Sequence, residues 1–497
     1  MTEAEAAKGR KAPEEAMSKA VASRSLVKKP SRLWGWLRTL GFGLQLSLAF
    51  AFVSFGIRSY LARTRLQAAL AQMDRTDPGW RLQDIEAARA VVPDQENSAL
   101  RVIDIGKRLP DSPHAWIEDD FATQLQSVPA PNRLTAEQSA HLTQRLKEVG
   151  PLLEEARGLS ELPRGRYPII YARNPLGTLL AGQQKSRGVL QLLVLDATAR
   201  ADSGDVRGAM TSCRAALNVG RAIGDEPLAI SQLIRVAEVM IACKTAGRIL
   251  AQGEPDPEDL KDLQTRLEEE DAHPYWRTVC RGERAFDNAV LEALESGAVS
   301  VSEMADSRPD WQDFLVDPLI QDNIRAYHPQ LFTDSARLQA AAELPPGMRG
   351  PAVEQIYSEI RKRGLNFETI LLPALGKLAD ACDRWHATLR CTAVALAAER
   401  YRRLHGDWPP SLDAMTPDLL AAVPTDPFTD DALLYHRLPD GVVIYSVSTD
   451  GVDNGGAVEE ANPTLPGADL GVRLWDVAKR RQPPLPPPAA APGMPPR

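Results

Sequence analysis

One stretch constrains the fold of this chain more than any other: residues 39–57, TLGFGLQLSLAFAFVSFGI, contain no charged side chain. As an α-helix rising about 1.5 Å per residue, this stretch would be roughly 28 Å long, which matches the hydrocarbon core of one bilayer. Trp34 and Trp36 precede it and Tyr60 follows it, at the places where aromatic side chains meet the membrane interface. The sequence therefore predicts a single transmembrane helix over residues 34–60.

The charges on the two sides of this stretch are uneven. Residues 1–38 carry nine Lys and Arg and four Glu, a net charge of +5, whereas the whole chain carries −8, so the remainder carries −13. Because basic flanks stay in the cytoplasm, we expect residues 1–33 there as a disordered tail, and residues 61–497 on the other side of the membrane. The acidic remainder disfavours a large nucleic-acid surface, which needs clustered cations.

A cleaved signal peptide is the alternative interpretation of the apolar stretch. The stretch is longer than the apolar region of a signal peptide, and no small-x-small cleavage site follows it. We therefore expect an uncleaved signal-anchor that crosses the membrane once.

The cysteines indicate neither a zinc cluster nor a thioredoxin-like pair, because none of them has C-x-x-C spacing. The five are Cys213, Cys243, Cys280, Cys382 and Cys391. We interpret most of them as small buried hydrophobic residues of helices. Cys213 with Cys243 is the pair that we would test as a disulfide.

Residues 61–373 are expected to form an α-helical domain, because they are rich in Ala, Leu, Arg and Glu and are interrupted by Pro and Gly. Helices are predicted in 133–159, 226–253 and 256–272, and two helices joined at Ser203-Gly204-Asp205 are predicted in 192–224. Thr135 and Asp205 are typical N-caps, and 226–253 is apolar on two faces, which favours a central position. The segment around Gly204 resembles one tetratricopeptide hairpin, but no second copy follows at a period near 34 residues. We therefore expect an irregular helical array.

The segment 165–177, GRYPIIYARNPLG, departs from the helical pattern. Its aromatic and β-branched residues predict a short extended segment that crosses the array. It is either a connector packed by Tyr167 and Tyr171 or a loop that lines a ligand cleft. In the second case Arg173 and Asn174 would contribute to the site.

Residues 374–477 are expected to form a small α+β module. A long helix is indicated by apolar residues that recur every seven positions, at Leu375, Cys382, Leu389 and Leu396. Gly406 and the following Trp408-Pro409-Pro410 end this helix. Two strands near 432–438 and 442–448 are predicted to pair as a hairpin.

This C-terminal part resembles the C-terminal domain of the major pseudopilin of type II secretion over about 85 of the 497 residues. The shared words, in the order of that family, are Tyr401, Gly406, Trp408-Pro409, Leu412, Leu420, Val423-Pro424, Asp426-Pro427, Leu434-Tyr435, Ile444–Val447, Asp450-Gly451, Gly455-Gly456 and Ala468–Asp476. The resemblance implies a long helix followed by an antiparallel hairpin or sheet. The whole layout resembles uncharacterised membrane-anchored envelope proteins of diderm bacteria that carry this tail. This second resemblance implies an inner-membrane protein whose bulk is periplasmic.

The pseudopilin family binds Ca²⁺ in the loop that follows these strands. Carried over by position, Asp450 and Asp469 are the expected side-chain ligands, and Asp453 is a third candidate. Carbonyl groups of residues 446–448 could complete an oxygen shell, which a hard cation such as Ca²⁺ prefers. The alternative is a solvated loop whose acidic side chains cap turns. The twelve-residue spacing of an EF-hand is absent from the sequence.

Two departures from the pseudopilin pattern argue against assembly into a pseudopilus. About 315 residues separate the apolar span from the long helix, where a pseudopilin has a direct connection. The segment Gly41–Leu46 is faintly similar to a prepilin processing site, but Leu46 occupies the position of the expected glutamate. We therefore interpret the C-terminal part as a borrowed module on a different membrane protein.

Catalytic motifs are missing from the sequence. It contains no His-Glu-x-x-His, Gly-x-Ser-x-Gly, phosphate-loop or dinucleotide motif, and no two of its seven histidines have metal-ligand spacing on one helix. The acidic run 268–271, EEED, is interpreted as a solvated helix end. Glu399 lies where the long helix expects an apolar side chain, and we expect it to pair with Arg400, Arg402, Arg403 or an arginine of the helical body.

The leading hypothesis is a mainly α, membrane-anchored envelope protein without catalysis, whose helical domain binds or scaffolds a protein partner that the sequence does not identify. Its possible cofactor is Ca²⁺ in the C-terminal module, and residues 478–497 are a proline-rich tail expected to be disordered. The second hypothesis is an extracytoplasmic hydrolase with its site in a cleft of the helical domain. The third is a divergent type II secretion component, which would require processing at Gly41.

Overall fold

A computed structural model describes residues 32–110, 119–178, 180–304, 313–363, 373–458, 465 and 467–486. Most of the expected disordered tails, 1–31 and 487–497, lie outside the described residues. The chain divides into two compact units, one that ends at Thr64 and one that begins at Arg65. All of the contacts reported below lie within the second unit.

The described part is mainly helical, with one small sheet near the C-terminus. The helices are α2 (Arg32–Thr76), α3 (Leu82–Ala88), α4 (Ser98–Arg108), α5 (Asp119–Ser127), α6 (Ala136–Glu148), α7 (Gly150–Arg157), α8 (Ala181–Ser203), α9 (Val206–Arg221), α10 (Ala229–Gln252), α11 (Pro257–Asp271), α12 (Tyr275–Glu295), α13 (Val301–Met304), α14 (Asp313–Ala342), α15 (Pro346–Lys362) and α17 (Pro373–His405). The strands are β1 (Leu434–Leu438), β2 (Gly441–Ser446) and β3 (Leu470–Trp475).

The apolar stretch forms a helix that is long and apolar enough to cross a membrane. Its side chains over residues 40–57 are exposed, and Phe52 is 80% exposed, as expected for a lipid-facing helix. The helix α2 ends at Thr76, sixteen residues beyond the expected end at Tyr60. The reason is local, because residues 61–76 consist mostly of Ala, Leu, Arg, Gln and Met, which are strong helix formers.

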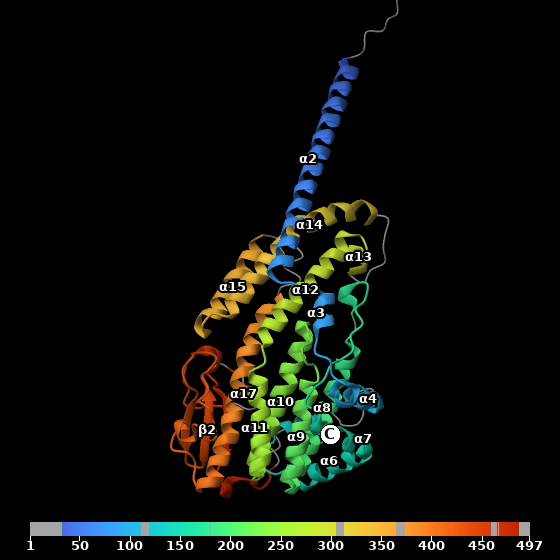
Figure 1. The fold of residues 1–497 in the computed structure, drawn as a ribbon. Coiled ribbons are helices and arrows are strands. Elements are labelled where there is room, and N and C mark those ends of the chain that lie inside the picture. Colours follow the sequence, from blue (N-terminus) through green and yellow to red (C-terminus); the bar gives the residue numbers. More distant parts are fainter. Residues whose placement is uncertain are drawn as a thin grey trace, which may run out of the picture. The chain divides into compact units, whose positions relative to one another are not determined.

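Long helices lie side by side in the second unit, as Figure 1 shows for α8, α9, α10, α11 and α17. The junction between α8 and α9 was predicted correctly: Gly204 has a φ of 94°, and Asp205 accepts a hydrogen bond from the backbone N–H of Gly208. Thr135 caps α6 in a reciprocal capping box with Gln138. These caps fix where each helix begins and therefore which face it turns inward.

The helices α10 and α17 form the centre of the second unit. Residues 391–399 of α17 are all buried, because α10 and α11 cover one side of the helix and the sheet covers another. One continuous hydrophobic core runs from Ala99 of α4 through α10 and α17 to Leu474 of β3. The residues 61–373 and 374–477, which the sequence analysis treated as two domains, thus share a core.

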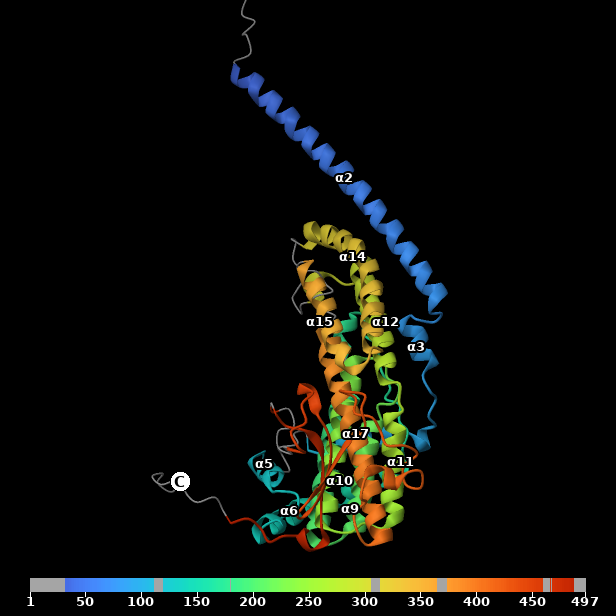
Figure 2. The ribbon, with the colours of Figure 1, turned by 90° about the vertical axis from the view of Figure 1, so that its left-hand side faces the viewer.

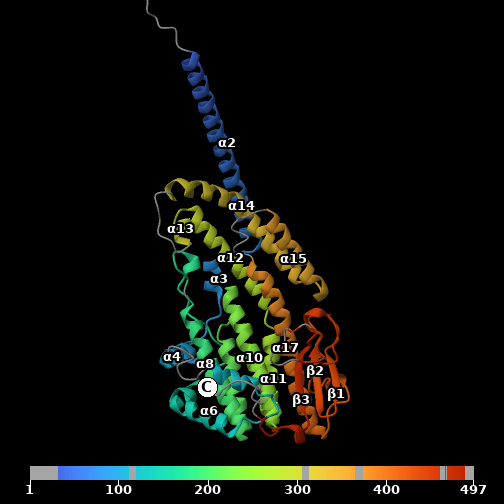
Figure 3. The ribbon, with the colours of Figure 1, turned by 180° about the vertical axis from the view of Figure 1, so that it is seen from behind.

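The sheet is antiparallel, with the strand order β1-β2-β3. Leu434 pairs with Tyr445 and Ser446 pairs with Leu470, which confirms the predicted hairpin and adds a third strand. Figures 2 and 3 show the sheet lying along α17. The strand β2 is buried along its whole length, as expected for a central strand that packs on a helix.

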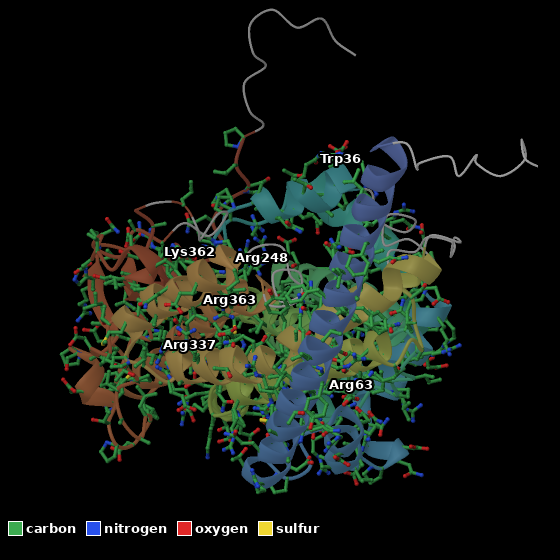
Figure 4. The ribbon with its side chains drawn as sticks, turned by 90° about the horizontal axis from the view of Figure 1, so that it is seen from above. Trp36, Arg63, Arg248, Arg337, Lys362 and Arg363 are labelled. Carbon is green, nitrogen blue, oxygen red and sulfur yellow. The ribbon has the colours of Figure 1, made fainter. Side chains whose placement is uncertain are left out.

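A second group of helices, α12, α14 and α15, packs together, and most of its buried hydrophobic residues belong to the same core. Asp334 of α14 is buried and accepts hydrogen bonds from Arg337 and from Arg363 at the end of α15, both labelled in Figure 4. Arg363 therefore joins the end of α15 to α14, and Arg337, which lies on α14 itself, also donates to Glu359 of α15 at 2.6 Å. The two arginines compensate the buried charge of Asp334, which would be strongly destabilising if it were unpaired.

Glu399 of α17 is fully buried, and its partner comes from the far end of the chain. Arg480 donates to both carboxylate oxygens, at 3.0 and 2.8 Å, and Arg402 donates to the same oxygens at 2.7 and 3.1 Å. Arg480 also donates to the carbonyl groups of Gly253 and Trp475. The expected pair with Arg402 is therefore confirmed, and Arg480 ties the end of the described chain to α10 and α17.

We expect Glu399→Gln to lower the free energy of unfolding by about 3 kcal/mol, because Arg480 would stay buried without its counter-charge. The matched control is Glu354→Gln. Glu354 forms an exposed pair with Arg361, so its loss should cost less than about 0.5 kcal/mol. Denaturant unfolding of the full-length protein in detergent measures both values. Equal stabilities of the two variants would contradict this account of Glu399.

Candidate functional site

The segment 165–177 forms an extended connector, as predicted, and it is held by the start of α4. Asn97 accepts a hydrogen bond from the backbone N–H of Arg166 and donates to its carbonyl group, at 2.9 and 3.0 Å. Gly165 lies so close to Ala222 that a Cβ atom would come within 2.5 Å of its backbone. This anchoring places Tyr167, two residues after Gly165, inside the helical array, where only 1% of its surface is exposed.

Beneath the connector lies a buried polar cluster between α8 and the start of α10. Glu226, in the loop before α10, accepts hydrogen bonds from Gln183 of α8 and Ser231 of α10. Gln183 also donates to Ser231 at 2.9 Å. All three side chains are at most 3% exposed. Burial raises the pKa of Glu226, and hydrogen bonds from Ser231 and Gln183 and the charge of Arg89 oppose this effect.

A second glutamate, Glu238 of α10, has a similar environment beside Ser186, which lies one turn after Gln183 on α8. Glu238 of α10 accepts a hydrogen bond from Ser186, and the two residues are 4% and 0% exposed. Burial raises the pKa of Glu238 to about 7, and the hydrogen bond from Ser186 opposes this only in part. Glu238 can therefore gain or lose a proton near neutral pH, which an exposed glutamate cannot do.

Tyr167 packs against α8 near these side chains. Its ring lies against α8, where a Cβ atom on Gly182 would approach the ring to 2.8 Å. Burial raises the pKa of its hydroxyl well above the ordinary value, and the charges of Glu238 and Glu226 add to this effect. Among the residues that the structure describes, the hydroxyl has no hydrogen-bond partner. The same holds for one oxygen each of Gln183, Glu226 and Glu238.

Ion pairs lie close to this cluster, because the charge of Arg89 acts on Glu226. Arg89, whose side chain is 1% exposed, donates to Glu86 and to Asp225. Arg166 also donates to Glu86, and so does the hydroxyl of Tyr171 at 3.2 Å. Tyr171 is only half-buried, and burial together with the charge of Glu86 raises its pKa.

The four connector residues named from the sequence do not form one cleft. Tyr167 is buried, Tyr171 is half-buried, and Arg173 is exposed to solvent. Asn174 donates to the carbonyl group of Glu303 instead of facing the cluster. The sequence analysis located the connector and Tyr167 but missed Glu226 and Glu238. The available signal was Glu238 itself, the one acidic residue of α10, in a segment expected to be central.

The three acidic residues predicted to bind Ca²⁺ bind backbone N–H groups in the structure. Asp469 is fully buried and accepts hydrogen bonds from the N–H groups of Asn454, Gly456 and Ala457. Asp450 accepts from the N–H of Val452. In the part of the chain that the structure describes, no three His, Cys, Asp or Glu side chains are grouped to hold a metal ion.

Asp453 belongs to the same loop, and its neighbours explain the glycines there. It accepts from the N–H of Gly455 and from the hydroxyl of Tyr445, at 2.8 and 2.9 Å. Gly455 and Gly456 have φ values of 73° and 78°, which residues other than glycine rarely adopt. The glycines therefore let the loop turn its N–H groups toward Asp453 and Asp469.

Two further expectations are corrected. The acidic run 268–271 is not simply a solvated helix end: Glu270 is 1% exposed and accepts from Arg235 at 2.7 and 2.8 Å, and Asp271 bonds His386 and Arg390. These acids receive basic partners from α10 and α17, which the local sequence does not reveal.

The suggested disulfide is also corrected, because all five cysteines are free and buried. Cys213 donates to the carbonyl oxygen of Ala242 at 3.4 Å and has no bond to Cys243.

No family model matches this chain, and comparisons with curated proteins and with solved structures found no match.

We predict that Glu238 makes stability depend on pH. Because its pKa in the folded protein, about 7, lies above the ordinary 4.5, its contribution is fully present below pH 4.5 and is lost as the pH rises through 7. Glu238→Gln should remove this loss, so the variant gains about 2 kcal/mol relative to the parent between pH 5 and pH 8. The measurement is denaturant unfolding in low-salt buffer, with the exposed Glu137→Gln as control. A parent-to-variant difference that stays constant with pH would refute the prediction.

Proposed function

We propose that this chain is a single-pass inner-membrane protein of a bacterial envelope, with a cytoplasmic N-terminus and a periplasmic body. The observation that carries the proposal is the exposed apolar helix over residues 40–57, which directly follows a basic segment. The span supports membrane association, and the basic segment supports the orientation through the positive-inside rule.

We further propose that the body is a binding or scaffolding structure rather than an enzyme. Support comes from how its buried charges are used. Asp196 of α8 binds Arg157 and Ser212, and Glu270 of α11 binds Arg235, so each carboxylate joins neighbouring helices. Such pairs favour a rigid body with one arrangement of its helices. The alternative of a hydrolase cleft has less support, since Tyr167 is buried and Arg173 points to solvent.

The pseudopilin resemblance gains support from the order of elements, a long helix, a hairpin and a third strand. A divergent type II secretion component remains the alternative proposal. It has to account for α10 and α11, which cover the faces of α17 that the sheet leaves open. A pseudopilin-like module would thus serve here as an integral part of the scaffold.

The orientation can be tested with cysteine labelling, because all five native thiols are buried. In intact cells, a membrane-impermeant maleimide should label Thr123→Cys on the exposed side of α5. It should label Ser18→Cys only after the membrane is disrupted. The parent protein should stay unlabelled in both cases. Labelling of Ser18→Cys alone in intact cells would overturn the proposed orientation.

On the strength of the family resemblance, we also propose that Ca²⁺ binds at the loop that contains Asp450 and Asp453, with Asp469 as a further ligand. Asp450 and Asp453 each accept two hydrogen bonds in the structure, and their carboxylates have further oxygen lone pairs for a cation. Calcium should then raise the Tm of the full-length protein relative to EDTA by a few degrees. The Asp450→Asn/Asp453→Asn variant should lose this shift, whereas Asp418→Asn, outside the loop, should keep it. The same Tm in calcium and in EDTA would exclude a stabilising ion.

A further inference from the structure

The segment that follows the apolar span packs on α14 through an aromatic contact. We call residues 65–80 the stem, of which residues 65–76 continue α2. Trp80 is fully buried and forms one hydrophobic cluster with Leu66 of the stem and Phe332 of α14. The rings of Trp80 and Phe332 meet edge to face, and their centroids are 5.2 Å apart. Phe332 is therefore a point at which α14 holds the stem.

One turn before Phe332, His328 of α14 is fully buried, with 0% of its side chain exposed. The His328 ring stacks on the Phe332 ring at a centroid distance of 5.4 Å. Its Nδ1 atom lies 2.6 Å from Oε1 of Glu295, and its Nε2 atom lies 3.0 Å from Oδ1 of Asn288. Glu295 and Asn288 both belong to α12, which packs against α14 (Figure 1). His328 thus joins the Phe332 contact to α12.

Both ring nitrogens of His328 face oxygen atoms that can only accept hydrogen bonds. A carboxylate and an amide oxygen have no hydrogen to donate, so each ring nitrogen has to supply one. A ring with hydrogen on both nitrogens is an imidazolium cation, and Glu295 is its counter-charge. A neutral ring has one N–H group only. It would keep one of the two bonds and would turn a buried lone pair toward an oxygen atom, which is destabilising.

Other charged groups on the elements around His328 have partners of their own. On α12, burial raises the pKa values of Glu283 and Asp287 and favours their uncharged forms. Glu303 of α13 accepts hydrogen bonds from Ser300. Charged side chains of the other elements pair with one another: Asp322 with Arg325 on α14, Asp77 of the stem with Arg281 and Arg284 of α12, and Asp334 and Glu359 with Arg337 and Arg363 between α14 and α15.

We propose that His328 is a pH-sensitive switch that controls how firmly the stem packs on α14. The imidazolium ring bonds α14 to α12 at two points and thereby fixes Phe332, on which Trp80 packs. An imidazole ordinarily loses its second proton at about pH 6.5. As the pH rises through this range, one bond to α12 is lost and the stem loosens. Because all of these contacts lie within the second unit, the effect does not depend on the orientation proposed above.

The competing arrangement is a neutral His328 with a rotated Asn288 amide. The Asn288 NH₂ group would then donate to Nε2, while Nδ1–H would still donate to Glu295. Both bonds would be made without a charge on the ring. In that case the packing of the stem would be the same at pH 5.5 and at pH 8.

The test measures how fast a thiol in the stem reacts at the two pH values. Leu70, which packs on the Trp80 cluster, is replaced by Cys in the full-length protein in detergent, and the rate of labelling by a water-soluble maleimide is recorded. Gln72→Cys, exposed on the same helix, corrects for thiol ionisation, and the five native thiols are buried. We expect the rate ratio of Leu70→Cys to Gln72→Cys to rise roughly tenfold from pH 5.5 to pH 8, the factor for one hydrogen bond to a charged group. An equal ratio at both pH values would overturn the proposal.

Variants locate the effect at His328. His328→Gln, added to both cysteine variants, should give the same ratio at pH 5.5 and pH 8. Glu295→Gln keeps the imidazole but removes its counter-charge, so it should show the high ratio already at pH 5.5. The exposed His405→Gln should behave like the parent. If His328→Gln keeps the full rise, or Glu295→Gln keeps the low ratio at pH 5.5, the proposal is wrong. Far-UV circular dichroism checks that each variant is folded.

Discussion

The burial of α17 on every side is the constraint on which the rest of the structure depends. All side chains of residues 391–399 are buried, so every polar group there needs a hydrogen-bond partner. Glu399 obtains Arg480, and Arg480 in turn binds the carbonyl groups of Gly253 and Trp475. One buried charge thus ties together α10, α17, the sheet and the end of the described chain.

Five of the buried acids show two kinds of environment. Asp196, Glu270 and Glu399 each bind arginine from another element, and they join helices. Glu226 and Glu238 bind only neutral side chains, and burial raises their pKa values. If stability alone had shaped the interior, an apolar residue in place of Glu238 would serve as well. The stability of the fold therefore does not explain why Glu226 and Glu238 are acidic.

Local sequence signals predicted the elements well and their partners poorly. The periodicity from Leu375 to Leu396 predicted α17, and Gly406 predicted its end, because spacing and caps act within a few residues. Arg480 as the partner of Glu399 was not predictable, since 81 residues separate them. The run 268–271 was misinterpreted for the same reason: whether an acid faces water or Arg235 depends on how α10 and α11 pack.

The candidate site shows the same limit. Tyr167 stood out because an aromatic residue in an extended segment is unusual among helices, whereas Glu226 and Glu238 look like ordinary acidic residues until the packing of α8 against α10 is known. The acidic residues of the C-terminal loop were expected from the sequence to be calcium ligands, and this stays a prediction. Their orientation toward the N–H groups of Gly455 and Gly456 depends on backbone turns that the loop sequence permits but does not dictate.

The state of the cysteines bears on the proposed periplasmic location. An oxidising compartment favours disulfides, yet all five thiols are free. Burial raises the pKa values of Cys213 and Cys243 to about 12, so almost no reactive thiolate forms at neutral pH. A thiol that is neither ionised nor exposed cannot attack a disulfide of another protein. Free cysteines in this core are therefore compatible with an oxidising environment for as long as the array stays folded, and a well-packed helical interior is what keeps them reduced.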